Sequence, residues 1–154
     1  MFQMRSILFL LVFFTACSGT AVAQNSGKVS WTYSAKKIAA NKYEIVLSAA
    51  IQRGWHLYSQ KQTEDAIALP TEIRFVNNPL VVKQGAVQER GKLIATFDKA
   101  TNSNSRYYSD KVDFVQTVTL KANVKTTVSG EVEFMVCDDK QCLPPERVKF
   151  SVKL

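Results

Sequence analysis

The chain has 154 residues, of which 46% are hydrophobic and 21% are charged, and its formal net charge is +7 at pH 7. The positive charge is spread along the sequence and forms no long basic run. Nucleic-acid binding would need a clustered basic stripe, so we expect a solvated basic surface and no nucleic-acid partner.

Residues 1–23 are predicted to be a secretory signal peptide. Arg5 provides the positive start, residues 7–14 (ILFLLVFF) form an apolar run too short to span a bilayer, and Ala21-Val22-Ala23 matches the small-x-small cleavage pattern. A retained membrane anchor and a lipid attached to Cys17 are the alternatives. In each case the chain is exported, and cleavage would leave a mature chain without a membrane span.

Residues 24–154 are predicted to form one domain, in which period-2 alternation dominates after a loose polar lead at 24–28. Hydrophobic residues at every second position mark four strands that each bury one face, and Gln116 interrupts the second of them. The four rows are Tyr43, Ile45, Leu47 and Ala49; Val112, Phe114, Val118 and Leu120; Val132, Phe134 and Val136; and Val148, Phe150, Val152 and Leu154.

Residues that favour turns separate the alternating segments. They are Arg53-Gly54, Asn77-Asn78-Pro79, Gln84-Gly85, Ser129-Gly130 and Pro144-Pro145. Residues 59–69 are expected to form at most one helical turn, and the polar residues 98–106 the most mobile loop. Many short strands without a long helix predict an immunoglobulin-like antiparallel β-sandwich, with a closed barrel as the alternative.

Two cysteines remain after removal of Cys17, and they are close in sequence. Cys137 ends an alternating strand, and Cys142 opens the next one after four polar residues. A hairpin-like approach would bring their Cα atoms within the roughly 4.4–6.8 Å that a disulfide requires. In an oxidising compartment the two cysteines are therefore a candidate disulfide.

The spacing leaves two roles open for this disulfide. Closing so short a loop stabilises a protein by roughly 2 kcal/mol, against about 4 kcal/mol for a loop of about 50 residues, so the bridge is a weak staple. A loop-borne pair can also exchange with other thiols. The pair lacks Cys-x-x-Cys spacing and no βαβ pattern surrounds it, so the chain is not a thioredoxin.

Three stretches, in matching order and spacing, carry a resemblance to a known family. They are Ile51-Gln52-Arg53-Gly54-Trp55-His56-Leu57-Tyr58, Arg106-Tyr107-Tyr108-Ser109-Asp110-Lys111-Val112-Asp113-Phe114, and Cys137 followed by Cys142-Leu143-Pro144-Pro145-Glu146. Together they resemble the N-terminal periplasmic domain of the thiol:disulfide interchange protein DsbD.

This resemblance implies an immunoglobulin-like fold whose cysteine pair cycles between disulfide and dithiol. Electrons would arrive from one thioredoxin-fold protein and leave to another in the periplasm, through transient mixed disulfides. Cys142 would bond to the partner and Cys137 would resolve the mixed disulfide. The family's shielding aromatic matches Phe97 here, with an ordinary core residue as the alternative. Tyr58 is expected near the cysteines by the same comparison, although a purely structural tyrosine is equally consistent with it.

The sequence departs from the family pattern in two ways. Four residues separate the cysteines where the family member has five, and Leu143 replaces an aromatic residue. The family's longer proteins continue into membrane helices and a thioredoxin-like domain, so we expect the reductant of this chain to be a separate protein. Asp138 and Asp139 disfavour a thiolate whereas Lys140 favours one, so we expect no strongly acidic cysteine.

No cofactor and no metal are expected. His56 is the only histidine and no Cys-His-acid signature surrounds it, so we expect an ordinary half-exposed strand residue. His56, Met135 and the two cysteines could in principle bind copper, but the pattern gives little support to this. The main competing function is a non-catalytic envelope binding or assembly module in which the Cys137–Cys142 disulfide is structural.

Overall fold

The structure, a computed structural model, describes residues 22–99 and 102–154. The predicted signal peptide lies outside the described residues except for its last two positions, and Cys17 lies outside them as well. Cleavage and lipidation therefore stay predictions. The described part of the chain contains no helix long and apolar enough to cross a bilayer.

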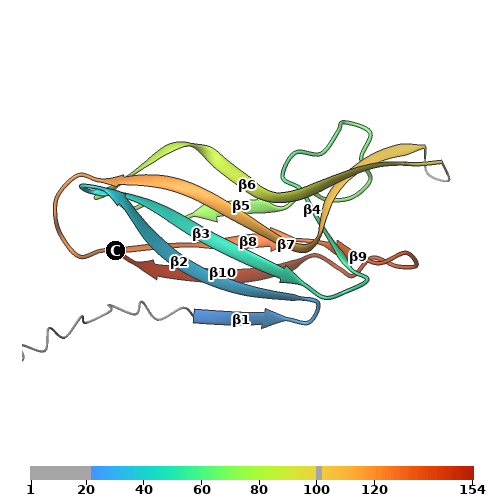
Figure 1. Cartoon of the computed structure of the whole chain (residues 1–154), viewed down its shortest axis with the longest axis horizontal. Helices are drawn as coiled ribbons and strands as arrows, with labels where there is room; N and C mark the ends of the chain where they lie inside the picture. Colours follow the sequence, from blue (N-terminus) through green and yellow to red (C-terminus); the bar gives the residue numbers. More distant parts are fainter. Residues whose placement is uncertain (1–21, 100–101) are drawn as a thin grey trace, which may run out of the picture.

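The described residues form antiparallel strands in two sheets. The larger sheet has the order β1-β2-β3-β7-β4-β9, with β6 also paired to β7, and the smaller one the order β10-β8-β5. The strands are β1 Val22–Ser26, β2 Val29–Ala39, β3 Lys42–Ile51, β4 His56–Tyr58, β5 Glu72–Phe75, β6 Val81–Asp98, β7 Ser103–Leu120, β8 Thr127–Phe134, β9 Val136–Cys137 and β10 Glu146–Lys153. Two packed antiparallel sheets confirm the predicted immunoglobulin-like sandwich (Figure 1).

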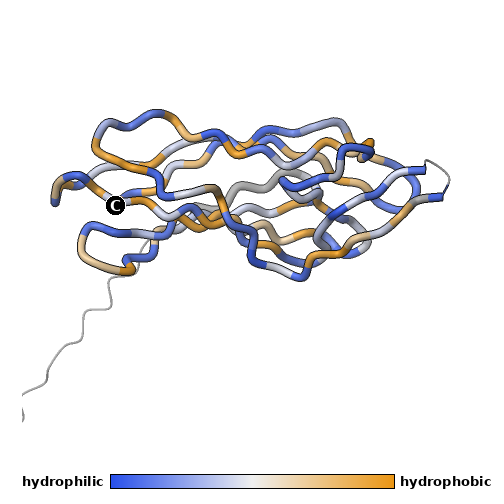
Figure 2. The backbone as a smooth tube through the Cα atoms, turned by 90° about the horizontal axis from the view of Figure 1, so that it is seen from above, coloured by the Kyte–Doolittle hydropathy of each residue, from blue (hydrophilic) through white to orange (hydrophobic). Residues whose placement is uncertain are grey.

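The core forms where the alternating rows of both sheets face each other, and Figure 2 shows hydrophobic positions recurring along the strands. Trp31 of β2 is fully buried, and its ring centroid lies 5.9 Å from that of Phe114 in β7 and 5.3 Å from that of Phe134 in β8. One indole therefore joins the two sheets. All four predicted rows contribute buried side chains, with Tyr43 and Leu154 only partly buried.

Two predicted turns lie inside strands instead. Gly85 has a φ of +67° and sits in a bulge of β6, where the buried amide of Gln116 donates hydrogen bonds to the carbonyl oxygens of Gln84 (3.1 Å) and Gly85 (3.3 Å). Gln116 thus interrupts its apolar row because it fastens this bulge. Gly130 lies in the middle of β8, where the ring of Phe150 and the backbone of Arg74 leave no room for a side chain.

Two further expectations were wrong. Residues 24–26, part of the expected loose lead at 24–28, pair with β2. Residues 59–69 contain one hydrogen-bonded turn, in which the N–H of Ala66 donates to the carbonyl oxygen of Thr63, and this stays within the expected limit of one helical turn. The expected mobile loop at 98–106 is largely strand, because β6 runs to Asp98 and β7 begins at Ser103. Cross-strand pairing extends this polar hairpin where the residue types alone indicated a loop.

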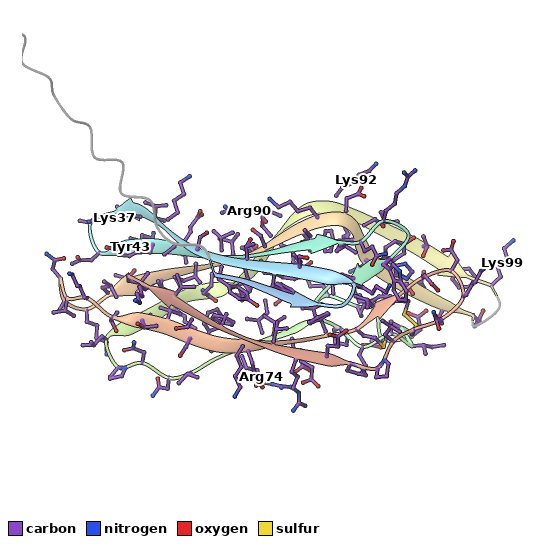
Figure 3. The ribbon with its side chains drawn as sticks, turned by 90° about the horizontal axis from the view of Figure 1, so that it is seen from below. Lys37, Tyr43, Arg74, Arg90, Lys92 and Lys99 are labelled. Atoms are coloured by element: carbon purple, nitrogen blue, oxygen red, sulfur yellow. A yellow bond between two sulfur atoms is a disulfide. The ribbon has the colours of Figure 1, made fainter. Side chains whose placement is uncertain are left out.

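β7 is the strand that positions the functional end of the molecule. β6 covers one of its edges along most of its length, while β3 and then β4 share the other. The change of partner falls at Asp110, whose φ is +68°, and the β6–β7 hairpin then projects beyond the sandwich. Lys99 lies at the tip of this hairpin, while Lys37 and Tyr43 lie at the opposite end of the sandwich (Figure 3).

Replacing Gly130 with alanine should destabilise the domain by about 1–3 kcal/mol, because the new Cβ would lie 2.5 Å from Cζ of Phe150. Ser129→Ala, one position earlier in β8, should change the free energy of unfolding by no more than about 0.5 kcal/mol. Urea unfolding of both variants measures this. Equal stability of the two would contradict the packing described for Gly130.

Candidate functional site

The two cysteines form a disulfide across neighbouring antiparallel segments. Their Cα atoms are 4.0 Å apart, slightly closer than the expected range. The intervening loop closes on itself, since the Asp138 carboxylate accepts hydrogen bonds of 2.8 Å from the backbone N–H groups of both Lys140 and Gln141. These bonds lower the pKa of Asp138. The predicted hairpin-like approach is therefore confirmed.

The two sulfur-bearing residues differ in exposure. Cys137 ends β9 and is only 2% exposed, whereas Cys142 is exposed at the surface. The chain then turns back along β9, with the N–H of Leu143 donating to the carbonyl oxygen of Val136 at 2.9 Å, and Leu143 packs against the core. A visiting protein can therefore reach Cys142 much more easily than Cys137.

Two depressions flank the disulfide, and Tyr58 and Cys142 line both. The first has a volume of about 500 Å³ and is lined by His56, Tyr58, Thr96, Ser105, Tyr107, Cys137, Asp138, Asp139, Lys140, Gln141 and Cys142. The second has a volume of about 320 Å³ and is lined by Tyr58, Ile67, Ala68, Ser103, Ser105, Met135 and Cys142. One is mainly polar or charged in its residues, and the other offers apolar side chains beside Cys142.

Three rings pack together beside the disulfide. The centroid of His56 lies 4.4 Å from that of Tyr107 and 5.4 Å from that of Tyr58, and Nε2 of His56 lies 3.2 Å from the Tyr58 hydroxyl. Strand alternation explains the cluster, since His56 and Tyr58 flank the buried Leu57 in β4, and Tyr107 pairs with Tyr58 across the sheet. We call His56, Tyr58 and Tyr107 the ring cluster.

Burial shifts the pKa values of His56 and Tyr58. It lowers the pKa of His56, although the nearby carboxylates of Asp139 and Asp138 act in the opposite direction. Burial likewise raises the pKa of Tyr58, with a further contribution from Tyr107. His56 is therefore neutral near pH 7, and both the histidine and the tyrosine are present as uncharged rings.

The structure brings Cys137, Cys142 and Tyr58 together, but it places Phe97 elsewhere. Thr96 lines the larger depression, and its neighbour Phe97 therefore points to the opposite face of the hairpin, where it is 53% exposed. Phe97 is thus neither a core residue nor in contact with the depression around the disulfide. The resemblance located the segment, but the strand register determines which of its side chains faces the sulfurs.

A hydrogen-bonded anchor holds the loop that forms one wall of the site. The Glu89 carboxylate of β6 accepts bonds from the Ser59 hydroxyl (2.7 Å), the Gln60 N–H (2.7 Å) and the Tyr108 hydroxyl (2.9 Å). Ser59 is fully buried at the start of the loop that carries Ile67 and Ala68. Sequence reasoning missed Glu89 because its partners lie about 20 to 30 residues away, and no local pattern marks it.

No group of three or more histidine, cysteine, aspartate or glutamate side chains in residues 22–99 and 102–154 is placed to hold a metal ion. What this end of the molecule offers is instead one bridge with a buried and an exposed cysteine. The fold and the site together define an immunoglobulin-like domain that presents a short-loop disulfide at one end.

The family follows from a direct comparison. The family model described as "Thiol:disulfide interchange protein DsbD, N-terminal" matches residues 27–154. The chain therefore belongs to the DsbD N-terminal domain family, as the resemblance indicated. The comparison with curated protein sequences found no match.

One solved structure supports the fold, and a second is similar over a shorter part of the chain. The N-terminal periplasmic domain of ScsB from Proteus mirabilis is similar with a TM-score of 0.57 and 14% identity, over 89% of this chain and 51% of that one, so this chain spans about half its length. The reduced N-terminal domain of DsbD from Neisseria meningitidis matches with a TM-score of 0.48 and 13% identity, over 74% of this chain and 78% of that one. At such identities the ScsB similarity supports the fold alone.

His56 should make the stability of the oxidised domain sensitive to mild acid. Because its pKa is lower in the folded state than the 6.5 of a free histidine, the unfolded chain takes up the proton first, and stability is lost as the pH falls below about 6.5. His56→Gln should flatten the dependence of the unfolding free energy on pH between about 6.5 and 5, as measured by urea unfolding.

Glu44→Gln is the matched control, since the pKa of Glu44 is lowered from 4.5, mainly by its hydrogen bond to Arg90, and its contribution is lost only below this window. This variant should keep the wild-type slope. An unchanged slope in His56→Gln would show that His56 is not held neutral by burial.

Proposed function

We propose that this domain carries reducing equivalents between thioredoxin-fold proteins of the periplasm through the Cys137/Cys142 couple. The observation that carries the proposal is the asymmetry of the bridge: Cys142 is exposed between two depressions, while Cys137 is 2% exposed beside the ring cluster. Membership in the DsbD N-terminal family supports it. The predicted signal peptide and the periplasmic origin of the similar ScsB domain support the location.

The proposed reaction moves two electrons in two substitutions. A thiolate of the reduced donor attacks Sγ of Cys142, the Cys137–Cys142 bond breaks, and its electron pair leaves on Cys137. The second thiol of the donor loses its proton and attacks the mixed disulfide. The donor is thereby oxidised, and Cys142 is released as a thiolate that takes up a proton. Transfer to the acceptor is the reverse sequence, with Cys142 attacking the acceptor's disulfide.

Tyr58 is our candidate for the residue that shields the buried side of the bridge. It is 6% exposed and lines both depressions beside the disulfide, whereas Cys142 itself stays exposed. Phe97 could shield them only if the β6–β7 hairpin moved and turned its outer face toward the disulfide. In its present position Phe97 would instead contact an incoming protein at the edge of the site.

Trapping tests the roles of the two cysteines. Cys137→Ala should accumulate a mixed disulfide with a thioredoxin-fold protein whose resolving cysteine has been replaced and whose remaining cysteine carries nitrothiobenzoate, because the exposed Cys142 attacks that sulfur and nitrothiobenzoate leaves. Cys142→Ala is the matched control, and it should accumulate roughly tenfold less because Cys137 is buried. Non-reducing electrophoresis measures the covalent complex. Equal trapping by both variants would contradict the assignment of Cys142.

The reduction potential separates an exchanging couple from a permanent staple. We expect a value less negative than about −300 mV, within reach of thioredoxin-like donors at about −270 mV. Equilibration with dithiothreitol of known redox state measures it. A more negative value, together with a failure to trap any thioredoxin-fold protein, would support the envelope binding module with a structural disulfide.

A further inference from the structure

Exchange at the bridge requires a group that can give a proton to the buried cysteine and take one from it, and the two cysteines do not provide such a group. Whenever the bond to Cys142 opens, the electron pair is left on Cys137, which is 2% exposed, and burial disfavours a thiolate. Whenever the bond closes again, the Cys137 thiol must lose its proton before its sulfur can attack. A proton carrier beside Cys137 would serve both directions of exchange.

We propose that His56 transfers this proton to and from Cys137, which makes it a catalytic residue of the exchange. The inference rests on the proposed function and deepens it. His56 pairs directly with Cys137 in the β4–β9 ladder, and Cys137 pairs with Cys142 on its other side. Three consecutive positions across the sheet are therefore imidazole, buried sulfur and exposed sulfur.

The placement of the two residues suits a proton transfer. Directly opposed residues in antiparallel strands have Cβ atoms about 4.5–5.5 Å apart, and His56 and Cys137 also line the same depression. The imidazole is held by the Tyr107 ring at 4.4 Å and by the Tyr58 hydroxyl at 3.2 Å from Nε2. The Tyr58 contact uses one ring nitrogen, and an imidazole has a second one to offer to the sulfur.

The charges around His56 support both halves of the cycle. Burial keeps the imidazole neutral near pH 7, so it can accept a proton. Asp139 and Asp138, on the loop that follows Cys137, then stabilise the imidazolium. Lys140 is a further charged residue that lines the same depression, while Tyr58 from β4 and Tyr107 from β7 pack their rings against the imidazole.

The step is balanced as follows. In closure, the Cys137 S–H gives its proton to His56, the Cys137 thiolate attacks Sγ of Cys142, and the bond from Cys142 to the partner breaks with the electron pair leaving on the partner sulfur. The imidazolium then returns its proton to solvent or to that leaving thiolate. In opening, His56 first takes up the proton that the donor thiol loses as it becomes the attacking thiolate, and the resulting imidazolium protonates Cys137 as its sulfur leaves.

The attack of Cys137 on Cys142 can be measured separately from the first reaction, because each of the two reactions releases one coloured nitrothiobenzoate. Fully reduced domain is mixed with dithiobis(nitrobenzoate); Cys142 attacks first and releases one nitrothiobenzoate, and Cys137 then attacks the mixed disulfide on Cys142 and releases a second. His56→Gln should leave the first release unchanged and slow the second by about 10–100-fold near pH 7. The difference should shrink at alkaline pH, where hydroxide can take the proton in place of the imidazole.

Controls distinguish proton transfer from packing. Glu44→Gln changes a carboxylate of β3 that bonds to Arg90 and lines neither depression, so this variant should release both groups at wild-type rates. In His56→Ala, added free imidazole should accelerate the second release, whereas it should leave the wild type unchanged. A second release that is equally fast in His56→Gln, or equally slowed at every pH and not rescued by imidazole, would overturn the assignment of His56.

The same experiment distinguishes two failures, that of the proton-transfer role of His56 and that of thiol–disulfide exchange at Cys142. If the first release is rapid but the second is indifferent to His56, exchange at Cys142 stands and only the proton-transfer role is lost. If the folded reduced domain shows no rapid first release, Cys142 is not an exchanging thiol, and the proposed function and the role of His56 are both overturned.

Discussion

The site depends on the pairing of β4, a strand of three residues, between β7 and β9. Leu57 is fully buried in the core and fixes the register, because a shift by one residue would turn it to the surface. The same register places His56 and Tyr58 on the opposite face, beside Cys137 and Tyr107. One hydrophobic side chain thus determines which groups surround the disulfide.

The two cysteines of the disulfide differ in accessibility, because Cys137 is buried and Cys142 is exposed. A partner meets Cys142 beside apolar side chains such as Ile67, which is 69% exposed, while Cys137 is enclosed by the ring cluster. The enclosure that protects Cys137 from wrong partners also removes it from solvent water. The closest base therefore has to come from the protein, and His56 occupies that position.

Period-2 patterns predicted β3, β7, β8 and β10, because each of these strands buries one face in a core that the whole domain shares, but they did not mark the other described strands. They could not distinguish a glycine in a turn from one inside a strand, since Gly130 is required by Phe150 and Arg74, which are distant in sequence. The cysteine spacing predicted the disulfide, and the family resemblance located Tyr58. The positions of Phe97 and Glu89 depend on hairpin register and on long-range hydrogen bonds, which no local pattern encodes.

The central claim is that partners exchange with the bridge through Cys142. The most direct measurement starts with the oxidised wild-type domain and a reduced thioredoxin-fold protein, stops the reaction with acid within its first turnover, and maps the mixed disulfide by peptide mass spectrometry. The account predicts that the partner's cysteine is linked to the peptide containing Cys142. A linkage to Cys137, or a bridge that stays closed throughout, would contradict it.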